Sequence, residues 1–269
     1  MPTDSNTPRT LQTVTTATEI IDALATLDSA GVTVLAERLG LSKSTTYTHL
    51  QTLEAAGLIT KHGTDYQLSY KFLQLGEYVK HRSLLYQVGK AEVDRLADET
   101  GQYCHLVSEE NGRGVNLYKI RGETAVGDKY QAAKLQHRDR LHMTAAGKAI
   151  LAALERDRVK EIIETHGLPS WTEHTITDPD TLLEALSDIR ERGYAYNDEE
   201  EIEGLRAVGA PICDRDGRVL GSLSVSGPTS FLKGDTFRQT IPERVVSAAN
   251  VIEVNINMAK QSAKLARDQ

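Results

Sequence analysis

Apolar residues at helical spacing predict three short helices near the start of the chain. The second helix follows Gly31, with Thr33 as its expected N-cap, and Ser42 is expected to cap the third. Gly57 supplies the left-handed conformation in which helices commonly end. The helices carry their apolar positions at Ile20, Ile21, Leu24 and Leu27, at Val34, Leu35 and Leu39, and at Thr46, Leu50 and Leu53.

A pair of short strand-like runs follows the third helix. Residues 58–62 and 66–69 flank a polar turn, which predicts a small β-hairpin. Helical segments are then expected around residues 71–81 and from Leu85 to a stop at Gly101. Three helices followed by a hairpin are the arrangement of a winged helix-turn-helix, whose third helix enters the DNA major groove.

The rest of the chain alternates between strand and helix patterns. Turn signals at Asn111-Gly112 and at 214–217 each separate two strand-like runs, which predicts antiparallel pairs. Because hairpins outnumber parallel crossovers, we expect an α+β fold with an antiparallel sheet in this half. The expected strands are 103–108, 115–120, 207–213 and 219–226, and the expected helices are 144–154, 156–166, 178–192 and one that carries Val245, Ala249, Ile252 and Ile256.

These elements divide the chain into two domains. Residues 1–15 lack apolar periodicity and are expected to form a flexible arm before a winged helix-turn-helix domain over 16–80. A linker helix over 81–90 leads to a second domain over 91–262, and residues 263–269 form a tail. A chain of 269 residues is long enough for two such domains.

Composition is that of an ordinary globular protein. Apolar residues make up 39% and charged residues 26%, and no stretch reaches the roughly 18 apolar residues of a membrane span. The polar start of the chain does not resemble a secretory signal, so a cytoplasmic location is expected. The net charge of −7 argues against nucleic-acid binding through bulk charge, although residues 38–80 carry five basic and three acidic side chains, a net +2.

The third predicted helix presents a polar face opposite its apolar positions. Short hydroxyls, an amide, a phenol and a cation lie there, and these groups donate to phosphates or contact base edges. Any solvated helix also shows such a face, but the tight turn before it and the hairpin after it favour DNA binding. The candidate DNA-binding residues are Lys43, Ser44, Thr45, Tyr47, Thr48 and Gln51, with His62 from the hairpin.

Small hydroxyl side chains mark a second candidate site. Alternation along residues 219–226 places Ser222, Ser224 and Ser226 on one face, together with Leu220. Small serines are expected where a ligand fits against a sheet. A plain edge or solvent-facing strand is the alternative interpretation.

A helix start in the same half has equally small residues. Residues 144–148 begin a helix with Ala145 and Ala146, which leave the first backbone N–H groups accessible, and helix N-termini attract anions. A close contact between helix and sheet would require the same small residues. Both interpretations stay open at this point.

Other polar residues do not indicate catalysis. The acidic run 197–201 has no paired histidines beside it and is interpreted as a solvated loop. His105 and His142 are isolated and are interpreted as core or rim residues, and Cys104 should face away from His105 on a strand. The chain has no nucleophile elbow, phosphate loop, zinc-protease motif or CxxC pair. No catalytic residue, metal site or cofactor is therefore expected.

Three segments carry a family resemblance. LAERLGLSKSTTYTHLQTLEAAGLI, residues 35–59, is similar to the winged-helix half of the IclR family of transcriptional regulators. LHMTAAGKAIL, residues 141–151, and the stretch 176–228 resemble the effector-binding domain of that family. The resemblance covers nearly the whole chain in the right order. Departures occur in the third helix, where the usual Val, His, Arg and Leu are replaced by Thr46, Tyr47, Thr48 and His49.

The resemblance implies a GAF-like effector domain, small organic acids as effectors, and assembly as a homodimer or a dimer of dimers. Asn197 stands where the family usually has Asp, and Ala207 where some members have Cys. The effector contacts that the resemblance implies, together with the small-residue positions above, are Ala145, Ala146, Asn197, Leu205, Ala207, Ser224 and Ser226.

The sequence therefore predicts a DNA-binding transcriptional regulator whose operator binding changes with a small acidic effector. Its expected partners are double-stranded DNA, the effector and a second copy of the chain, with no membrane. The alternative is an enzyme or an acyl-binding domain that uses a winged helix for protein contacts. An enzyme should show a nucleophile or paired carboxylates beside the pocket, and the serines have no neighbouring base in sequence.

Overall fold

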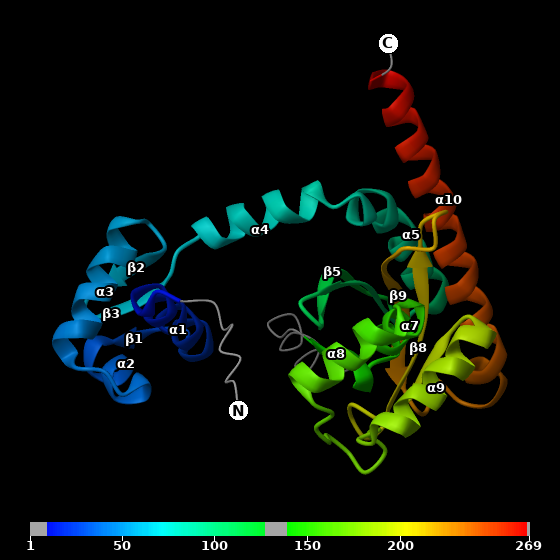
Figure 1. The fold of residues 1–269 in the computed structure, drawn as a ribbon, viewed down its shortest axis with the longest axis horizontal. Coiled ribbons are helices and arrows are strands. Elements are labelled where there is room, and N and C mark those ends of the chain that lie inside the picture. The colour runs from blue at the N-terminus through cyan, green and yellow to red at the C-terminus, as the bar shows by residue number, and fades with distance from the viewer. Residues whose placement is uncertain (1–9, 127–138, 268–269) are drawn as a thin grey trace, which may run out of the picture. The chain divides into compact units, whose positions relative to one another are not determined.

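The computed structural model describes residues 10–126 and 139–267 (Figure 1). Its contacts divide the chain into two units, Met1–Val79 and Lys80–Gln269, which are described separately. The first unit contains α1 (Gln12–Leu27), β1 (Ala30–Gly31), α2 (Val32–Leu39), α3 (Lys43–Ala55), β2 (Ile59–His62), β3 (Asp65–Leu68) and most of α4 (Lys71–Arg82).

Helices α1, α2 and α3 of the first unit share one small core. Leu24, Leu35 and Leu50, one from each helix, are almost completely buried and lie in the same cluster as Tyr66 of β3. Strand β3 lies between β1 and β2, and both of its pairings are antiparallel. The predicted winged helix-turn-helix is thus confirmed.

The start of α1 corrects the expected flexible arm. The helix begins at Gln12, so residues 12–15 are helical, while residues 1–9 of the arm lie outside the described residues. Leu11 and Val14 at this end are 68% and 60% exposed, so the first turn has no buried face and apolar periodicity gives no signal of its start.

The start of α2 also differs from its prediction. The helix begins at Val32 with Gly31 as its N-cap, so Thr33 is not the cap. Strand β1 explains the shift. Gly31 pairs with Asp65 of β3 in an extended conformation, and the helix begins directly after it. A strand of two residues is too short to produce an alternation that sequence reasoning could detect.

The second unit is an α+β domain. Its described strands form a six-stranded sheet in the order β6-β5-β4-β9-β8-β7, and every pairing is antiparallel, as predicted. Its elements are α5 (Leu84–Thr100), β4 (Tyr103–Glu110), β5 (Arg113–Arg121), β6 (Asp139–Arg140), the 3-10 turn η1 (Leu141–Met143), α7 (Ala145–Ala153), α8 (Arg156–His166), α9 (Pro179–Arg192), β7 (Ala195–Asp198), β8 (Leu205–Cys213), β9 (Val219–Pro228), the π-helical turn η2 (Thr236–Thr240) and α10 (Ile241–Arg267).

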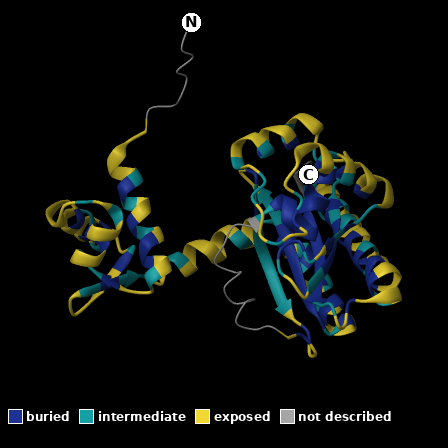
Figure 2. Ribbon diagram, turned by 90° about the horizontal axis from the view of Figure 1, so that it is seen from below, coloured by how far each residue is buried: buried dark blue, intermediate teal, exposed yellow. Residues whose placement is uncertain are grey.

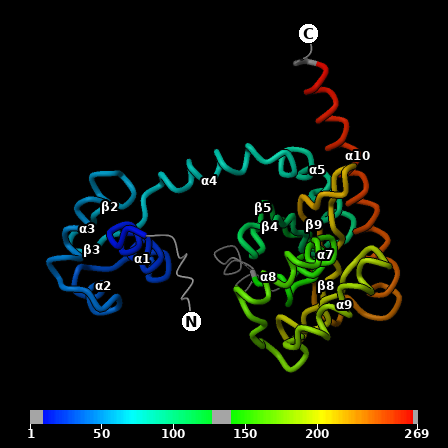
Figure 3. The backbone as a smooth tube through the Cα atoms, in the orientation of Figure 1, coloured from blue at the N-terminus to red at the C-terminus, as the bar shows by residue number. Residues whose placement is uncertain are grey.

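Helices cover both faces of the sheet. Helices α5 and α10 are far apart in sequence but lie side by side on one face, as Figure 3 shows. Leu96 of α5, Val225 of β9 and Ile252 of α10 are completely buried between them. Helix α7 covers the other face and α9 packs on α7, and Ile150 and Leu182 are fully buried there. In Figure 2 the strands are mostly buried, whereas α4 is largely exposed.

Two expected boundaries change in the second unit. Ser83 separates α4 from α5 and caps α5, so the linker helix expected over 81–90 consists of the end of one helix and the start of another. Helix α10 continues to Arg267, so residues 263–267 of the expected tail are helical, and residues 268–269 lie outside the described residues.

Candidate functional site

The polar face of α3 is exposed along its length. The Ser42 hydroxyl accepts a hydrogen bond from the Thr45 backbone N–H at 3.0 Å and fixes the start of the helix. Thr46 and Leu50 are fully buried on the opposite side. All six predicted positions of α3 are exposed, as is His62 at the end of β2; they are Lys43, Ser44, Thr45, Tyr47, Thr48 and Gln51.

Some of these side chains are already engaged within the helix. The Thr48 hydroxyl donates to the Ser44 carbonyl at 3.0 Å, and the Gln51 amide donates weakly to Glu54 at 3.4 Å. Tyr47 is 48% exposed, so its ring and hydroxyl are accessible on this face.

The seven predicted effector residues line one cavity in the second unit. The cavity has a volume of about 20 Å³, room for about one water molecule. It lies between the sheet and the N-terminus of α7. Its lining is Ala145, Ala146, Asn197, Leu205, Ala207, Ser224 and Ser226, together with His105, Val107, Asn116, Thr144 and Glu201.

The start of α7 packs directly onto strand β8. A Cβ atom at Gly209 would lie 2.7 Å from the Ala145 carbonyl carbon, so only glycine permits this approach. The Thr144 hydroxyl caps the helix by accepting from the Gly147 N–H at 2.9 Å. The small residues of α7 thus allow close packing against the sheet and also form one wall of the cavity.

The serine alternation of β9 holds where it meets the cavity. Ser224 and Ser226 line the cavity, and Ser222 is buried on the same face without a hydrogen-bond partner in the described structure. A register shift reverses the expected faces at the start of β9: Gly221 pairs with Ile212 and Val219 with Cys213, so Leu220 is left unpaired. Val219 packs on the side of α7, and Leu220 packs on the side of α5 and α10. The prediction was wrong for Val219 and Leu220 because a bulge inverts the alternation.

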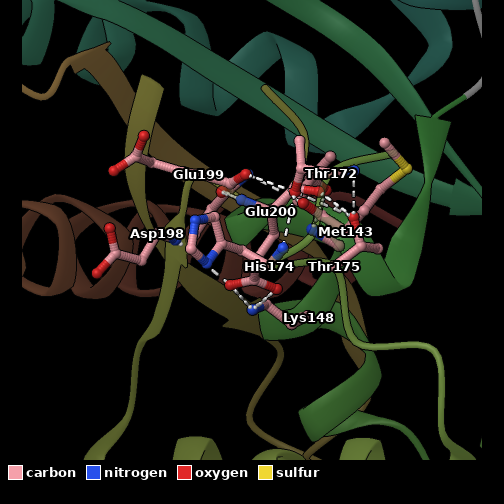
Figure 4. Close-up of polar contacts among 11 residues, drawn as sticks. Met143, Lys148, Thr172, His174, Thr175, Asp198, Glu199 and Glu200 are labelled. Carbon is pink, nitrogen blue, oxygen red and sulfur yellow. Dashed lines mark hydrogen bonds and ion pairs between the residues drawn. The ribbon is translucent and has the colours of Figure 1, made fainter. Parts of the chain in front are cut away.

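The acidic run 197–201 is not a solvated loop, contrary to the interpretation from sequence. Asn197, Glu200 and Glu201 are at most 7% exposed. The Asn197 amide donates to the Met143 carbonyl, and its oxygen accepts from the Glu200 N–H, both at 2.9 Å. Figure 4 shows the Glu200 carboxylate against the Lys148 ammonium of α7. A buried partner on a distant helix, which local composition cannot reveal, explains the error.

Burial changes the electrostatics of these groups. Desolvation lowers the pKa of Lys148 and raises that of Glu200, while the attraction between the two opposes both shifts. The pKa of Cys104 rises to about 12 and that of Cys213 to about 11, in both cases mainly through burial. Both thiols are therefore protonated and unreactive at neutral pH.

No described helix is long and apolar enough to cross a membrane. Within 10–126 and 139–267, no group of three or more His, Cys, Asp or Glu side chains is arranged to hold a metal ion.

Comparisons with known proteins agree with the geometry of both units. The family model described as "IclR helix-turn-helix domain" matches residues 13–63, and the one described as "Bacterial transcriptional regulator IclR C-terminal" matches residues 77–254. The chain belongs to the IclR family. The protein named "Probable HTH-type transcriptional regulator ArcR" from Halobacterium salinarum is 38% identical over 255 residues, which cover 94% of this chain and 96% of that protein.

Two further relatives support the same IclR assignment. The HTH-type transcriptional regulator KdgR of Escherichia coli K12 is 33% identical over 224 residues, 82% of this chain and 84% of KdgR. The crystal structure of the Thermotoga maritima IclR matches with a TM-score of 0.73 and 27% identity, covering 91% of this chain and 99% of that one. This IclR-family chain is a transcriptional regulator with a DNA-binding domain and a C-terminal effector-binding domain, and its relatives are regulators rather than enzymes.

Sequence reasoning missed part of the cavity of this IclR-family regulator. His105 was assigned to the core or rim, yet its Nε2 lies 3.0 Å from the Ser226 hydroxyl and its Nδ1 lies 3.4 Å from the Asn116 oxygen. The alternation of Cys104 and His105 along the strand did indicate opposite faces. Cys104 packs on the side of α5 and α10, and His105 lines the cavity. The cavity residues that sequence reasoning did not select are His105, Val107, Asn116, Thr144 and Glu201.

Proposed function

We propose that the exposed face of α3 contacts the operator in the major groove, and that His62 on the hairpin contacts the flanking backbone. The exposure of this face and the buried side that fixes the helix support the assignment. Lys43 supplies a cation for phosphate, whereas Tyr47 offers a ring for a thymine methyl and a hydroxyl for a base edge. Sequence preference should therefore depend more on Tyr47 than on Lys43.

We propose further that the cavity beside α7 binds a small organic acid. The observation that carries this proposal is that all seven residues selected from sequence line a single cavity at a helix N-terminus. None of the described lining residues is Lys or Arg, so the carboxylate would be held by the backbone N–H groups of Ala145 and Ala146 and by hydroxyls. Each hydrogen bond to a charged ligand contributes about 1.5–3 kcal/mol.

Glu201 and the small volume of the cavity limit which acids could bind there. Glu201 brings a carboxylate to the same cavity, which favours a ligand that carries a hydroxyl or amino donor besides its acid group. Because the cavity holds about 20 Å³, binding also requires its walls to separate. A compact hydroxy acid fits these requirements better than a bulky apolar acid.

A second copy of the chain is the third proposed partner. Helix α4 buries none of its residues, and Leu75 and Val79 on one side of it are 47% and 66% exposed. Apolar side chains one helical turn apart favour packing against another helix, and a palindromic operator requires two DNA-binding units. We infer a homodimer, with a dimer of dimers as the larger assembly, and a cytoplasmic location with the DNA.

A thermal-shift screen of small acids tests the effector proposal. A ligand present at about 100 times its Kd adds about 2.7 kcal/mol to the free energy of unfolding and raises the Tm. Hydroxy acids should raise the Tm of the parent more than the matched acids without a hydroxyl. An Ala146→Leu variant, whose larger side chain fills the cavity, should show no shift. Equal shifts in the parent and Ala146→Leu would place the ligand elsewhere.

A further inference from the structure

A buried ion pair joins the two walls of the proposed effector cavity. Lys148 lies in α7, two residues after Ala146, and its ammonium contacts both carboxylate oxygens of Glu200. The side chains of Lys148 and Glu200 are only 5% and 10% exposed. Glu200 directly precedes the cavity residue Glu201 and follows Asn197 by three positions. The pair thus connects the helix N-terminus to the segment between β7 and β8.

That segment is held in a conformation that its own sequence does not favour. Glu199 has a φ of +65°, in the left-handed region that non-glycine residues rarely adopt. The Thr172 hydroxyl donates to the Glu199 carbonyl at 2.8 Å, and the Thr175 hydroxyl donates to the Glu200 carbonyl at 2.6 Å. Figure 4 shows these contacts gathered around the ion pair. Several independent bonds therefore fix the segment that carries Glu201 and follows Asn197 of β7.

We propose that Lys148 and Glu200 are positioning residues of the effector site, which hold the α7 N-terminus and the 197–201 segment at the separation that a carboxylate requires. This inference rests on the proposed function of the cavity. Neither side chain lines the cavity, so neither would contact the ligand. Their role would be to keep the N–H groups of α7 directed at the ligand while the cavity opens and closes around it.

Simple stabilisation of the fold is the competing explanation, and it makes a different prediction. Buried ion pairs often add little to stability, because desolvation of the charges offsets their attraction, and neutral replacement of both partners is frequently tolerated. Lys148→Met keeps the aliphatic stem but leaves Glu200 without its cation. The double variant Lys148→Met/Glu200→Gln removes both charges and keeps side chains of similar shape. It can therefore be measured even if Lys148→Met alone does not fold.

Hydrogen exchange of the full-length protein tests the positioning role without any ligand. Two amides are informative, because the Gly147 N–H donates to Thr144 and the Glu200 N–H donates to Asn197, each at 2.9 Å. Both should exchange about tenfold faster in the double variant while the Tm stays close to that of the parent. Lys260→Met, which removes the ion pair between the 45% exposed Lys260 of α10 and Asp214 in the turn after β8, is the control distant from the cavity and should leave both amides unchanged.

Unchanged exchange at Gly147 and Glu200 in the double variant would overturn the proposal, as would faster exchange that merely follows a lower Tm throughout the second unit. The second readout is the Tm shift produced by sodium acetate relative to sodium chloride at equal ionic strength. Acetate should stabilise the parent and Lys260→Met but not the double variant. An equal shift in all three proteins would contradict the positioning role. If acetate does not stabilise the parent, the carboxylate proposal fails, and the exchange measurement still decides the role of the pair.

Discussion

His105 and Ser226 are hydrogen-bonded across neighbouring strands, with Nε2 of the imidazole 3.0 Å from the serine hydroxyl. Both side chains are buried and both line the cavity. The bond ties β4 to β9 at the position where a ligand would meet the sheet. The imidazole ring is held at both nitrogens, because its Nδ1 lies 3.4 Å from the Asn116 oxygen.

The first prediction concerns this imidazole. His105→Phe keeps an aromatic ring, slightly larger than imidazole, but removes both polar atoms, so Ser226 loses a partner in a buried site. We expect a cost of about 1–3 kcal/mol in the free energy of unfolding and at least a tenfold loss of effector affinity. Denaturant titration and calorimetry measure the two quantities. If His105→Phe binds the effector as tightly as the parent, the imidazole does not contribute to effector binding.

The second prediction separates the exposed and buried faces of α3. Tyr47→Ala should weaken operator binding by about 1–3 kcal/mol, because Tyr47 is exposed and proposed to contact bases, and should leave the Tm unchanged. Leu50→Ala should instead cost about 2–5 kcal/mol of stability, enough to unfold a small domain. Fluorescence anisotropy and circular dichroism report the two effects. Parent-like operator binding by Tyr47→Ala would show that α3 is assigned to the wrong surface.

The third prediction concerns pH. Burial, together with the charges of Arg140, Lys148 and Arg113, lowers the pKa of His142 below its ordinary 6.5, although its Nε2–H donates to the Pro169 carbonyl. The unfolded chain therefore binds this proton more readily than the folded chain, and stability should fall as the pH drops from about 6.5 through the folded pKa.

One such group changes the free energy of unfolding by at most about 1.4 kcal/mol per pH unit. His142→Gln keeps an N–H donor for Pro169 but does not titrate, so its loss of stability between pH 7.5 and 5.5 should be smaller than that of the parent. Urea titrations at the two pH values measure the difference. The same acid sensitivity in both proteins would show that other groups cause it.

The fourth prediction concerns assembly. Light scattering at micromolar concentration should give at least the dimer mass. Leu75→Glu/Val79→Glu places charges on the exposed apolar side of α4 and should shift the protein toward the monomer without lowering the Tm of the second unit. A monomer mass for the parent would contradict the proposed dimer.

The elements that sequence reasoning predicted well have strong local signals. Helix α9 is an example, because Asp178 caps it, Pro179 opens it and Gly193 ends it with a φ of +83°. Periodicity of 3.6 or 2 residues was sufficient wherever an element had one buried face and was longer than about six residues. The two-residue strand β1 is shorter than that and was missed. The bulge at Leu220 of β9 was missed because one extra residue inverts the alternation without any local signal.

The cavity could be predicted only in part. Ser224 and Ser226 were found from strand alternation, while the positions of Asn197, Leu205 and Ala207 came from the family resemblance. Glu200 was misplaced because a run of charges usually lies in solvent, and only the tertiary structure brings Lys148 of α7 against it. Contacts between residues about fifty positions apart leave no trace in a local pattern.

The most direct test of the account measures whether an effector in this cavity changes DNA binding. The parent protein is used to select a duplex from random DNA, and its affinity is measured by fluorescence anisotropy with and without the acid found in the thermal screen. We expect the acid to change the operator affinity of the parent about tenfold, a coupling of about 1.4 kcal/mol. Ser224→Ala should require about tenfold more acid for the same change. Ala146→Leu should bind the duplex as the parent does and show no response. An Ala146→Leu protein that folds normally and responds at the parent's concentration of acid would contradict the account.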